Sequence, residues 1–178
     1  MSILKFLKLD PLQSSRSSAE TETVRKIVSA LDRLDPEHAK FIAAFAYLLS
    51  RTAHADLAIS PEETSAMERI VMEHGGLPEE QAILVVQMAK TQNALFGGTE
   101  NYLVTREFNR IASHEQKIAL LHCLFAVSAA DTSISTVEDN EVSQIADQLR
   151  IEHRDFIAVR SKFRNYLAVL KKSPESKM

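Results

Sequence analysis

Apolar residues recur every three to four positions through most of the chain, the spacing that places them on one face of an α-helix. Local signals mark the helix ends. Asp35 precedes Pro36 as an N-cap before a first helical position, and Gly75 with Gly76 stops a helical pattern. The pattern predicts helices over residues 21–34, 36–52, 61–74, from 78 onward, 102–111, 114–130, 136–149 and 153–171.

Composition supports a helical protein. The 178 residues include only four Gly and five Pro, too few for the many turns of a β-sandwich or barrel. An apolar fraction of 45% and a charged fraction of 25% are typical of a globular domain with a substantial core. We therefore expect an all-α fold, a single-domain bundle of about seven to eight helices.

Three segments are expected along the chain. Residues 1–20 form an amphipathic N-terminal segment followed by a Ser-rich linker, residues 21–172 form the helical domain, and residues 173–178 form a disordered tail. Residues 1–9 (MSILKFLKL) either pack on the body or contact a membrane surface, since two lysines flank their apolar residues.

Charge and cysteine content exclude several functional classes. The net charge of −3 offers no general basic field for nucleic acid, although residues 151–178 carry seven basic against three acidic groups. The single Cys123 lies in an apolar run and excludes disulfides within the chain and Cys-based zinc sites. No apolar run approaches the length of a transmembrane segment, and no cleavable leader is evident, so a cytoplasmic location is expected.

Two segments 75 positions apart share a pattern. Residues 55–63 read ADLAISPEE and residues 130–138 read ADTSISTVE, so Ala, Asp, Ile, Ser and Glu recur in register. An Ala-rich apolar helix is predicted before each copy. The repetition predicts two pseudo-repeated helical hairpins around one core.

Helix capping explains part of the repeated pattern. Ser60 with Glu63, and Ser135 with Glu138, match the capping box S-x-x-E. In that motif the Ser oxygen accepts a backbone N–H of the first turn, and the Glu reaches back to the N–H of the cap. The repeated aspartates, at positions 56 and 131, have no such structural explanation.

The aspartates suggest a ligand site or a local structural role. An EF-hand is rejected, because positions 52, 54, 127 and 129 supply the wrong residues for its first ligands. If the repeats pack about a pseudo-two-fold axis, four carboxylates could converge to hold a divalent cation or basic side chains of a partner. The residues concerned are Asp56, Glu63, Asp131 and Glu138, with His54 nearby. Alternatively, each Asp accepts hydrogen bonds from amides of its own loop.

The repeat resembles the hallmark of the TerB-like (tellurite resistance protein TerB) domain family, two copies of A-D-G-x-I-x-x-x-E, each after a helix. The resemblance covers residues 36–165 and is greatest to uncharacterised bacterial TerB-like proteins. Both motif glycines are replaced, by Leu57 and Thr132, which predicts a loosened loop geometry. The resemblance implies that the family's acidic motif residues are the four carboxylates listed above.

The resemblance also implies an all-helical bundle in the cytoplasm or at the inner membrane face, associated with tellurite and other stress responses. One such domain forms part of a membrane-anchored DnaJ-like co-chaperone, and no enzymatic activity is established for the family. The first hypothesis is therefore a non-catalytic module that binds a protein partner through its acidic repeat loops. A divalent-metal-binding domain and a carboxylate-dependent enzyme are the alternatives, and the oligomeric state, a dimer included, is left open.

Known catalytic motifs are missing from the sequence. The chain has no H-E-x-x-H, no phosphate-binding G-x-x-x-x-G-K or G-x-G-x-x-G and no G-x-S-x-G. Aromatic residues among the C-terminal basic groups fit an apolar helix face over residues 156–170 better than a nucleic-acid surface. We expect neither an enzyme nor a nucleic-acid-binding protein, and no established cofactor.

Overall fold

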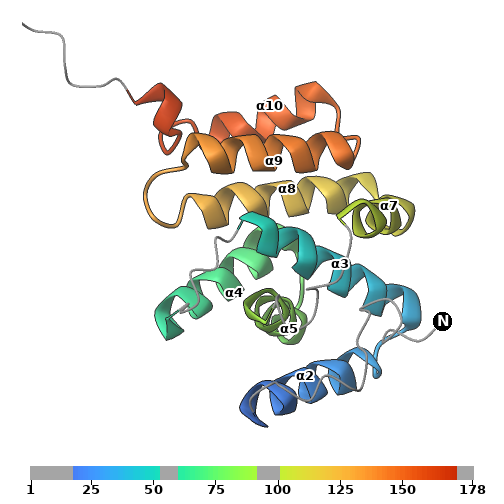
Figure 1. Ribbon diagram of the computed structural model, residues 1–178. Coiled ribbons are helices and arrows are strands. Elements are labelled where there is room, and N and C mark those ends of the chain that lie inside the picture. The colour runs from blue at the N-terminus through green and yellow to red at the C-terminus, as the bar shows by residue number, and fades with distance from the viewer. Residues whose placement is uncertain (1–17, 53–59, 92–100, 172–178) are drawn as a thin grey trace, which may run out of the picture.

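The computed structural model describes residues 18–52, 60–91 and 101–171, and within them the protein is all-helical, as predicted (Figure 1). These residues form eight α-helices and one short 3-10 helix, η1. The helices are α2 (Ser18–Leu31), α3 (Pro36–Thr52), α4 (Pro61–Gly75), α5 (Glu79–Lys90), α7 (Asn101–Ile111), α8 (His114–Ser128), α9 (Thr136–Gln148) and α10 (His153–Lys162), and η1 spans Ala168–Leu170.

The helices α3 and α8 form the centre of the molecule. Every residue from 41 to 50 in α3 is buried, and α3 packs against α5, α7, α8 and α9. The helix α8 packs against α3, α4, α9 and α10. In Figure 1, α9 and α10 lie on one side of α8, and α4, α5 and α2 lie on the other. One core joins all these layers.

The predicted duplication is visible as two pairs of consecutive helices, α3 with α4 and α8 with α9. Each pair packs across the other, because α4 contacts α8 and α3 contacts α9. Buried residues recur at the 75-residue spacing, since Met67 and Val71 of α4 correspond to Val142 and Ala146 of α9. The two halves therefore share one core, as the repeat predicted.

Local signals set most helix starts. Asp35 caps α3 as expected, because its Oδ1 accepts hydrogen bonds from the N–H groups of Glu37 (3.0 Å) and His38 (3.3 Å). At the other end of a helix, Gly76 has φ 65°, a left-handed conformation that costs glycine little and ends α4. Both features follow from residues within one turn of the helix end.

The last predicted helix is shorter than expected. The pattern predicted a helix over residues 153–171, yet α10 ends at Lys162. The chain then turns, and Ile134 pairs with this segment: its N–H donates to the Tyr166 carbonyl (2.7 Å) and its carbonyl accepts from Ala168 N–H (2.9 Å). A long-range pairing thus takes the backbone groups that a longer helix would have used.

Two other helices have ends that differ from the prediction by two or three residues. The helix α2 begins at Ser18 and ends at Leu31, three residues before the predicted end, and α8 ends at Ser128 rather than at residue 130. Helix ends commonly differ by one or two residues because terminal turns lack a full set of hydrogen bonds.

Candidate functional site

Three of the four predicted carboxylates lie in the described residues. Asp56 belongs to the first repeat loop, residues 53–59, and so does His54; both lie outside the described residues. Glu63 is the third residue of α4, Glu138 is the third residue of α9, and Asp131 lies in the loop between α8 and α9. The convergence of all four carboxylates stays a prediction.

The two glutamates form the capping boxes that the sequence predicted. Glu63 Oε2 accepts from the Ser60 N–H at 2.7 Å, and the Glu63 N–H donates to Ser60 Oγ at 3.2 Å. In α9, Glu138 Oε2 accepts from the Ser135 N–H at 2.8 Å, and the reciprocal bond measures 3.2 Å. One oxygen of each carboxylate is therefore used to start its own helix.

The second repeat loop keeps the conformation that a glycine would favour. Thr132 stands at the motif's glycine position and has φ 65°, which is uncommon for a β-branched residue. The Thr132 N–H donates to the Ala129 carbonyl at 2.9 Å, and Lys171 Nζ donates to the Thr132 carbonyl at 2.9 Å. The predicted loosening is therefore wrong for this loop. Its left-handed turn persists with threonine, and Asp131 beside it is exposed.

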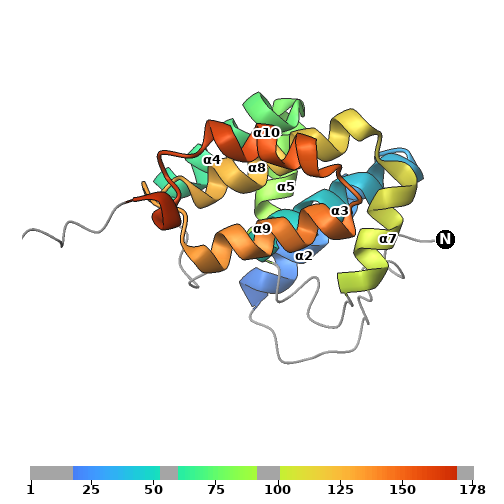
Figure 2. The same ribbon diagram turned by 90° about the horizontal axis from the view of Figure 1, so that it is seen from above.

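The C-terminal segment continues the surface of this loop. Through the pairing of Ile134 with Leu167, residues 166–171 lie against the loop, and Figure 2 shows η1 beside the start of α9. Large apolar side chains are exposed here. We define the repeat-loop surface as Asp131 together with Val137, Tyr166, Val169 and Leu170. The exposed fractions of the four large apolar side chains are 66%, 41%, 61% and 54%, in that order.

In the part of the chain that the structure describes, no group of three or more His, Cys, Asp or Glu side chains is placed to hold a metal ion. That statement does not extend to Asp56 and His54. A divalent cation held by the four repeat carboxylates therefore stays a prediction, and the described glutamates already form helix caps.

Cys123 lies in the core, in agreement with its place in an apolar run of the sequence. Burial raises the pKa of its thiol to about 12, so the reactive thiolate is scarce at neutral pH. His122, the residue before Cys123 on α8, is half-buried. It lies 3.5 Å from Lys162 Nζ and stacks on His74 with ring centroids 6.0 Å apart. Burial first, and then the charges of Lys162 and His74, lower the pKa of His122.

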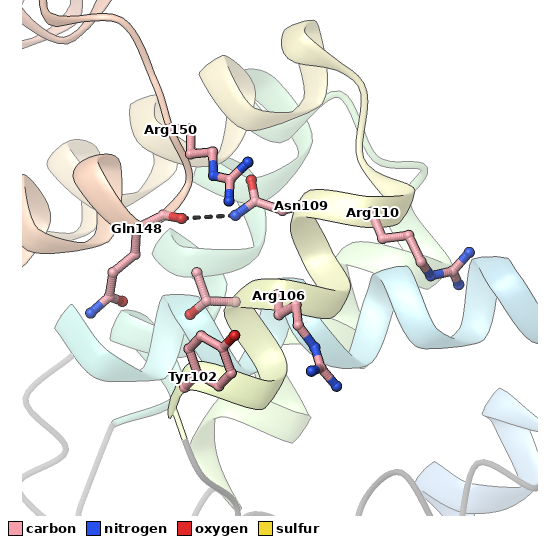
Figure 3. A pocket seen from close by; sticks show the side chains of 7 residues that line it. Tyr102, Arg106, Asn109, Arg110, Gln148 and Arg150 are labelled. Carbon is pink, nitrogen blue, oxygen red and sulfur yellow. Dashed lines mark hydrogen bonds between the residues drawn. The ribbon is translucent and has the colours of Figure 1, made fainter.

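Sequence reasoning missed a pocket between α7 and the end of α9 (Figure 3). Its volume is about 620 Å³, within the usual range for small-molecule sites. The lining residues are Tyr102, Thr105, Arg106, Asn109, Arg110, Gln148 and Arg150. The lining residues on α7 lie on one face of that helix. Nothing in the sequence of α7 indicates that Gln148 and Arg150, some 40 positions later, complete the pocket wall. No sequence motif could have found it.

None of the helices that the structure describes combines the length and the apolar character needed to cross a bilayer. Among protein families, the model described as "Tellurite resistance protein TerB" matches residues 41–161, which is more than half of the chain. The match includes both repeat motifs and runs from α3 to α10. Comparison with curated proteins and with solved structures gives no match.

Proposed function

Because this chain belongs to the family of the tellurite resistance protein TerB, we propose that it is a non-catalytic interaction domain that binds a protein partner in a cellular stress response. The partner binds at the repeat-loop surface. The observation that carries this proposal is the set of exposed apolar side chains next to the second repeat loop, at Val137 and in the segment 166–170 that pairs with Ile134.

Exposed apolar residues of this kind support a contact surface. Of the six large apolar side chains that are exposed in the described residues, four belong to the repeat-loop surface. An apolar group rimmed by polar residues is typical of a protein-binding site, since its burial against a partner is favourable. The exposed Asp131 adds a carboxylate that selects a basic residue of the partner.

The loop is well suited to present this surface. The capping box of α9 holds one end, and the pairing of Ile134 with Tyr166 and Ala168 holds its middle. The Lys171 bond to the Thr132 carbonyl closes the other side. A surface that is ordered before binding loses less conformational entropy on association, and this lowers the cost of binding.

The experiment compares one surface variant with a matched control. Val169→Asp places a charge in the repeat-loop surface, whereas Ile157→Asp places one at an exposed apolar residue of α10, 43% exposed. Each tagged protein is isolated from its native cells, and the co-purifying proteins are quantified. A partner present with wild type and Ile157→Asp, and lost with Val169→Asp, is then purified and its affinity measured by calorimetry.

The expected result is a loss of affinity of at least about tenfold in Val169→Asp, with the control close to wild type. Equal affinity in both variants would refute the assignment of this surface. Size-exclusion chromatography with light scattering is run alongside, because a second copy of the chain is also a protein partner. A dimer that Val169→Asp alone dissociates would identify that copy as the partner.

The metal alternative is tested with a separate variant. Thermal melts are recorded with Ca²⁺, Mg²⁺, Mn²⁺ and Zn²⁺ for wild type and for the variant with Asp56→Asn and Asp131→Asn. An ion at about 100 times its Kd adds roughly 2.7 kcal/mol to the free energy of unfolding. A rise in melting temperature that requires the two aspartates would replace the partner proposal with a metal site.

A further inference from the structure

The pocket between α7 and the end of α9 shares no residue with the repeat-loop surface. The surface lies at the N-terminal end of α9, whereas Gln148 and Arg150 lie at its C-terminal end. The 13 residues of α9 separate the two sites by about 20 Å at the rise of an α-helix. A ligand in the pocket would therefore bind independently of the proposed partner.

Among the residues that the structure describes, the pocket lining carries positive charge and no carboxylate. It contains three arginines, although the chain as a whole has a net charge of −3. Arg110 is engaged outside the pocket, where its Nη2 binds Glu37 at 2.5 Å and Glu107 at 2.8 Å. Figure 3 shows its side chain directed away from the other labelled residues. Arg106 and Arg150 form no salt bridge with any residue that the structure describes.

Arg150 is held in the pocket wall by an unusual backbone. It has φ 56°, and it occupies the position after a helix end that most often belongs to glycine. The two bonds of a Schellman motif are present: Arg150 N–H donates to the Asp147 carbonyl at 3.0 Å, and Ile151 N–H to the Ala146 carbonyl at 3.0 Å. Glycine would satisfy this turn without strain, so the turn itself does not require an arginine.

A neighbouring lysine also experiences the positive charge of Arg150. Burial first, and then the charge of Arg150, lower the pKa of Lys117 on α8. Two cations that raise each other's energy would both gain from an anion between or beside them. The effect of Arg150 on Lys117 agrees with the salt bridges, because Arg106 and Arg150 have no carboxylate partner among the described residues.

The polar groups at the end of α9 do not oppose an anion. A helix C-terminus carries partial negative charge on its last carbonyls. Here the carbonyls of Ala146 and Asp147 accept the two Schellman bonds. The Gln148 carbonyl accepts from Asn109 Nδ2 at 2.7 Å. With these carbonyls bonded, the guanidinium groups dominate the wall.

Asn109 adds a hydrogen-bond acceptor. Its bond to the Gln148 carbonyl fixes which atom of the amide is nitrogen, so its Oδ1 is the other atom. That oxygen is buried and accepts no hydrogen bond from the described residues. A buried acceptor without a donor is costly, and a ligand hydroxyl or amine would satisfy it. The ligand therefore needs a donor as well as a negative charge.

The rim and the volume indicate the ligand's size. Tyr102 is 69% exposed at the edge of the pocket, with the Arg106 guanidinium 5.7 Å from its ring centroid. This pair offers flat faces on which a planar ring can stack. The volume of about 620 Å³ is far larger than an inorganic phosphate ion needs and suits a small organic molecule.

We propose that this pocket binds a nucleoside monophosphate. The Arg150 guanidinium group holds the phosphate, since its planar fork matches the phosphate oxygens, and Arg106 adds positive charge beside Tyr102. Asn109 Oδ1 accepts from a ribose hydroxyl or a base amine, and Tyr102 stacks on the base. The pocket is thus a small-molecule site on an interaction domain.

The experiment is an NMR titration of the full 178-residue chain, in which backbone amide shifts locate the ligand. The probes are AMP, adenosine, inorganic phosphate and a short single-stranded RNA. We expect AMP to saturate with a Kd below about 1 mM and to shift amides of α7 and of residues 148–151. Adenosine and phosphate alone should each bind at least about tenfold more weakly.

The variants separate binding from folding. Arg150→Gly removes the guanidinium and places the favoured residue at φ 56°, so its melting temperature should equal or exceed that of wild type. It should nevertheless weaken AMP binding by at least about tenfold, and Arg106→Ala should do the same. Arg69→Ala removes an exposed arginine of α4, outside the pocket, and should bind AMP like wild type.

Each remaining outcome decides against the proposal. No saturation by AMP up to about 5 mM overturns it. Phosphate binding as tightly as AMP indicates a site for a free anion, and adenosine binding as tightly indicates that the arginines hold no phosphate. RNA binding more tightly than AMP, with shifts spread beyond the pocket, indicates a nucleic-acid surface. Unchanged AMP binding in Arg150→Gly places the ligand elsewhere.

Discussion

Thr132→Gly should stabilise the protein, although it deletes atoms. The residue has φ 65° in the second repeat loop, where a side chain with a Cβ is strained by roughly 1–2 kcal/mol. The Thr132 side chain is exposed, and the hydrogen bonds at this residue are made by its backbone N–H and carbonyl. The substitution therefore relieves strain and removes none of those bonds.

The gain is partly offset in the unfolded chain. Glycine has more conformational freedom than threonine, which lowers the free energy of the unfolded state by about 0.5–1 kcal/mol. The difference predicts a net gain of about 0.5–1 kcal/mol in the free energy of unfolding. For a chain of this size, such a gain raises the melting temperature by about 1–4 °C.

Urea denaturation and calorimetric melts of wild type and variant measure this gain. Thr136→Gly is the matched control, because Thr136 is an exposed threonine in the first turn of α9, at a helical φ. There the same exchange relieves no strain and should destabilise the protein by about 0.2–0.5 kcal/mol. If Thr132→Gly lost stability to the same extent as Thr136→Gly, the left-handed conformation of the loop and the strain argument would both be refuted.

Three further predictions follow from described residues. Ser135→Ala removes the capping oxygen of α9. It should lower the free energy of unfolding, measured by urea denaturation, by about 1 kcal/mol and leave partner affinity unchanged. A loss of partner binding at unchanged stability would show that Ser135 acts in the interface. Because the pKa of His122 lies below its ordinary value of 6.5, the unfolded chain binds more protons than the folded protein just below that pH. The contribution of His122 to stability is thus fully present above pH 6.5 and declines as the pH falls toward its lowered pKa. The melting temperature should therefore change less with pH over this range in His122→Gln than in wild type. Equal pH dependence in the two proteins would assign the effect to other groups. Cys123, with a pKa of about 12 and no exposure, should react with a thiol reagent at pH 8 only after addition of denaturant; immediate reaction in the native protein would contradict its place in the core.

Features that depend on neighbouring residues in the chain were predictable from the sequence alone. The helical fold, the Asp35 cap, the Gly76 stop and the capping boxes at Ser60 and Ser135 were all correct. Each rests on hydrogen bonds that span two to five residues, so the local sequence contains both partners. A third box, Ser113 with Gln116, was overlooked although its S-x-x-Q pattern is just as visible.

The candidate sites were only partly predictable. The repeat identified Asp131 and Glu138 as a pair worth following, and it correctly placed the glutamate in a cap. It could not reveal that the C-terminal segment lies against this loop and brings exposed apolar residues such as Val169 with it. The roles of Asp56 and His54 fall in residues 53–59 and stay predictions.

The sequence by itself determined where helices begin and which of their faces are apolar, because capping and periodicity are properties of contiguous residues. Tertiary structure alone decided three other features: the end of α10 at Lys162, the left-handed turn at Thr132, and the pocket that joins Asn109 to Arg150. In each, a group distant in the chain competes with or completes the local structure. These local conformations depend on how whole helices pack together, so short-range sequence patterns do not predict them.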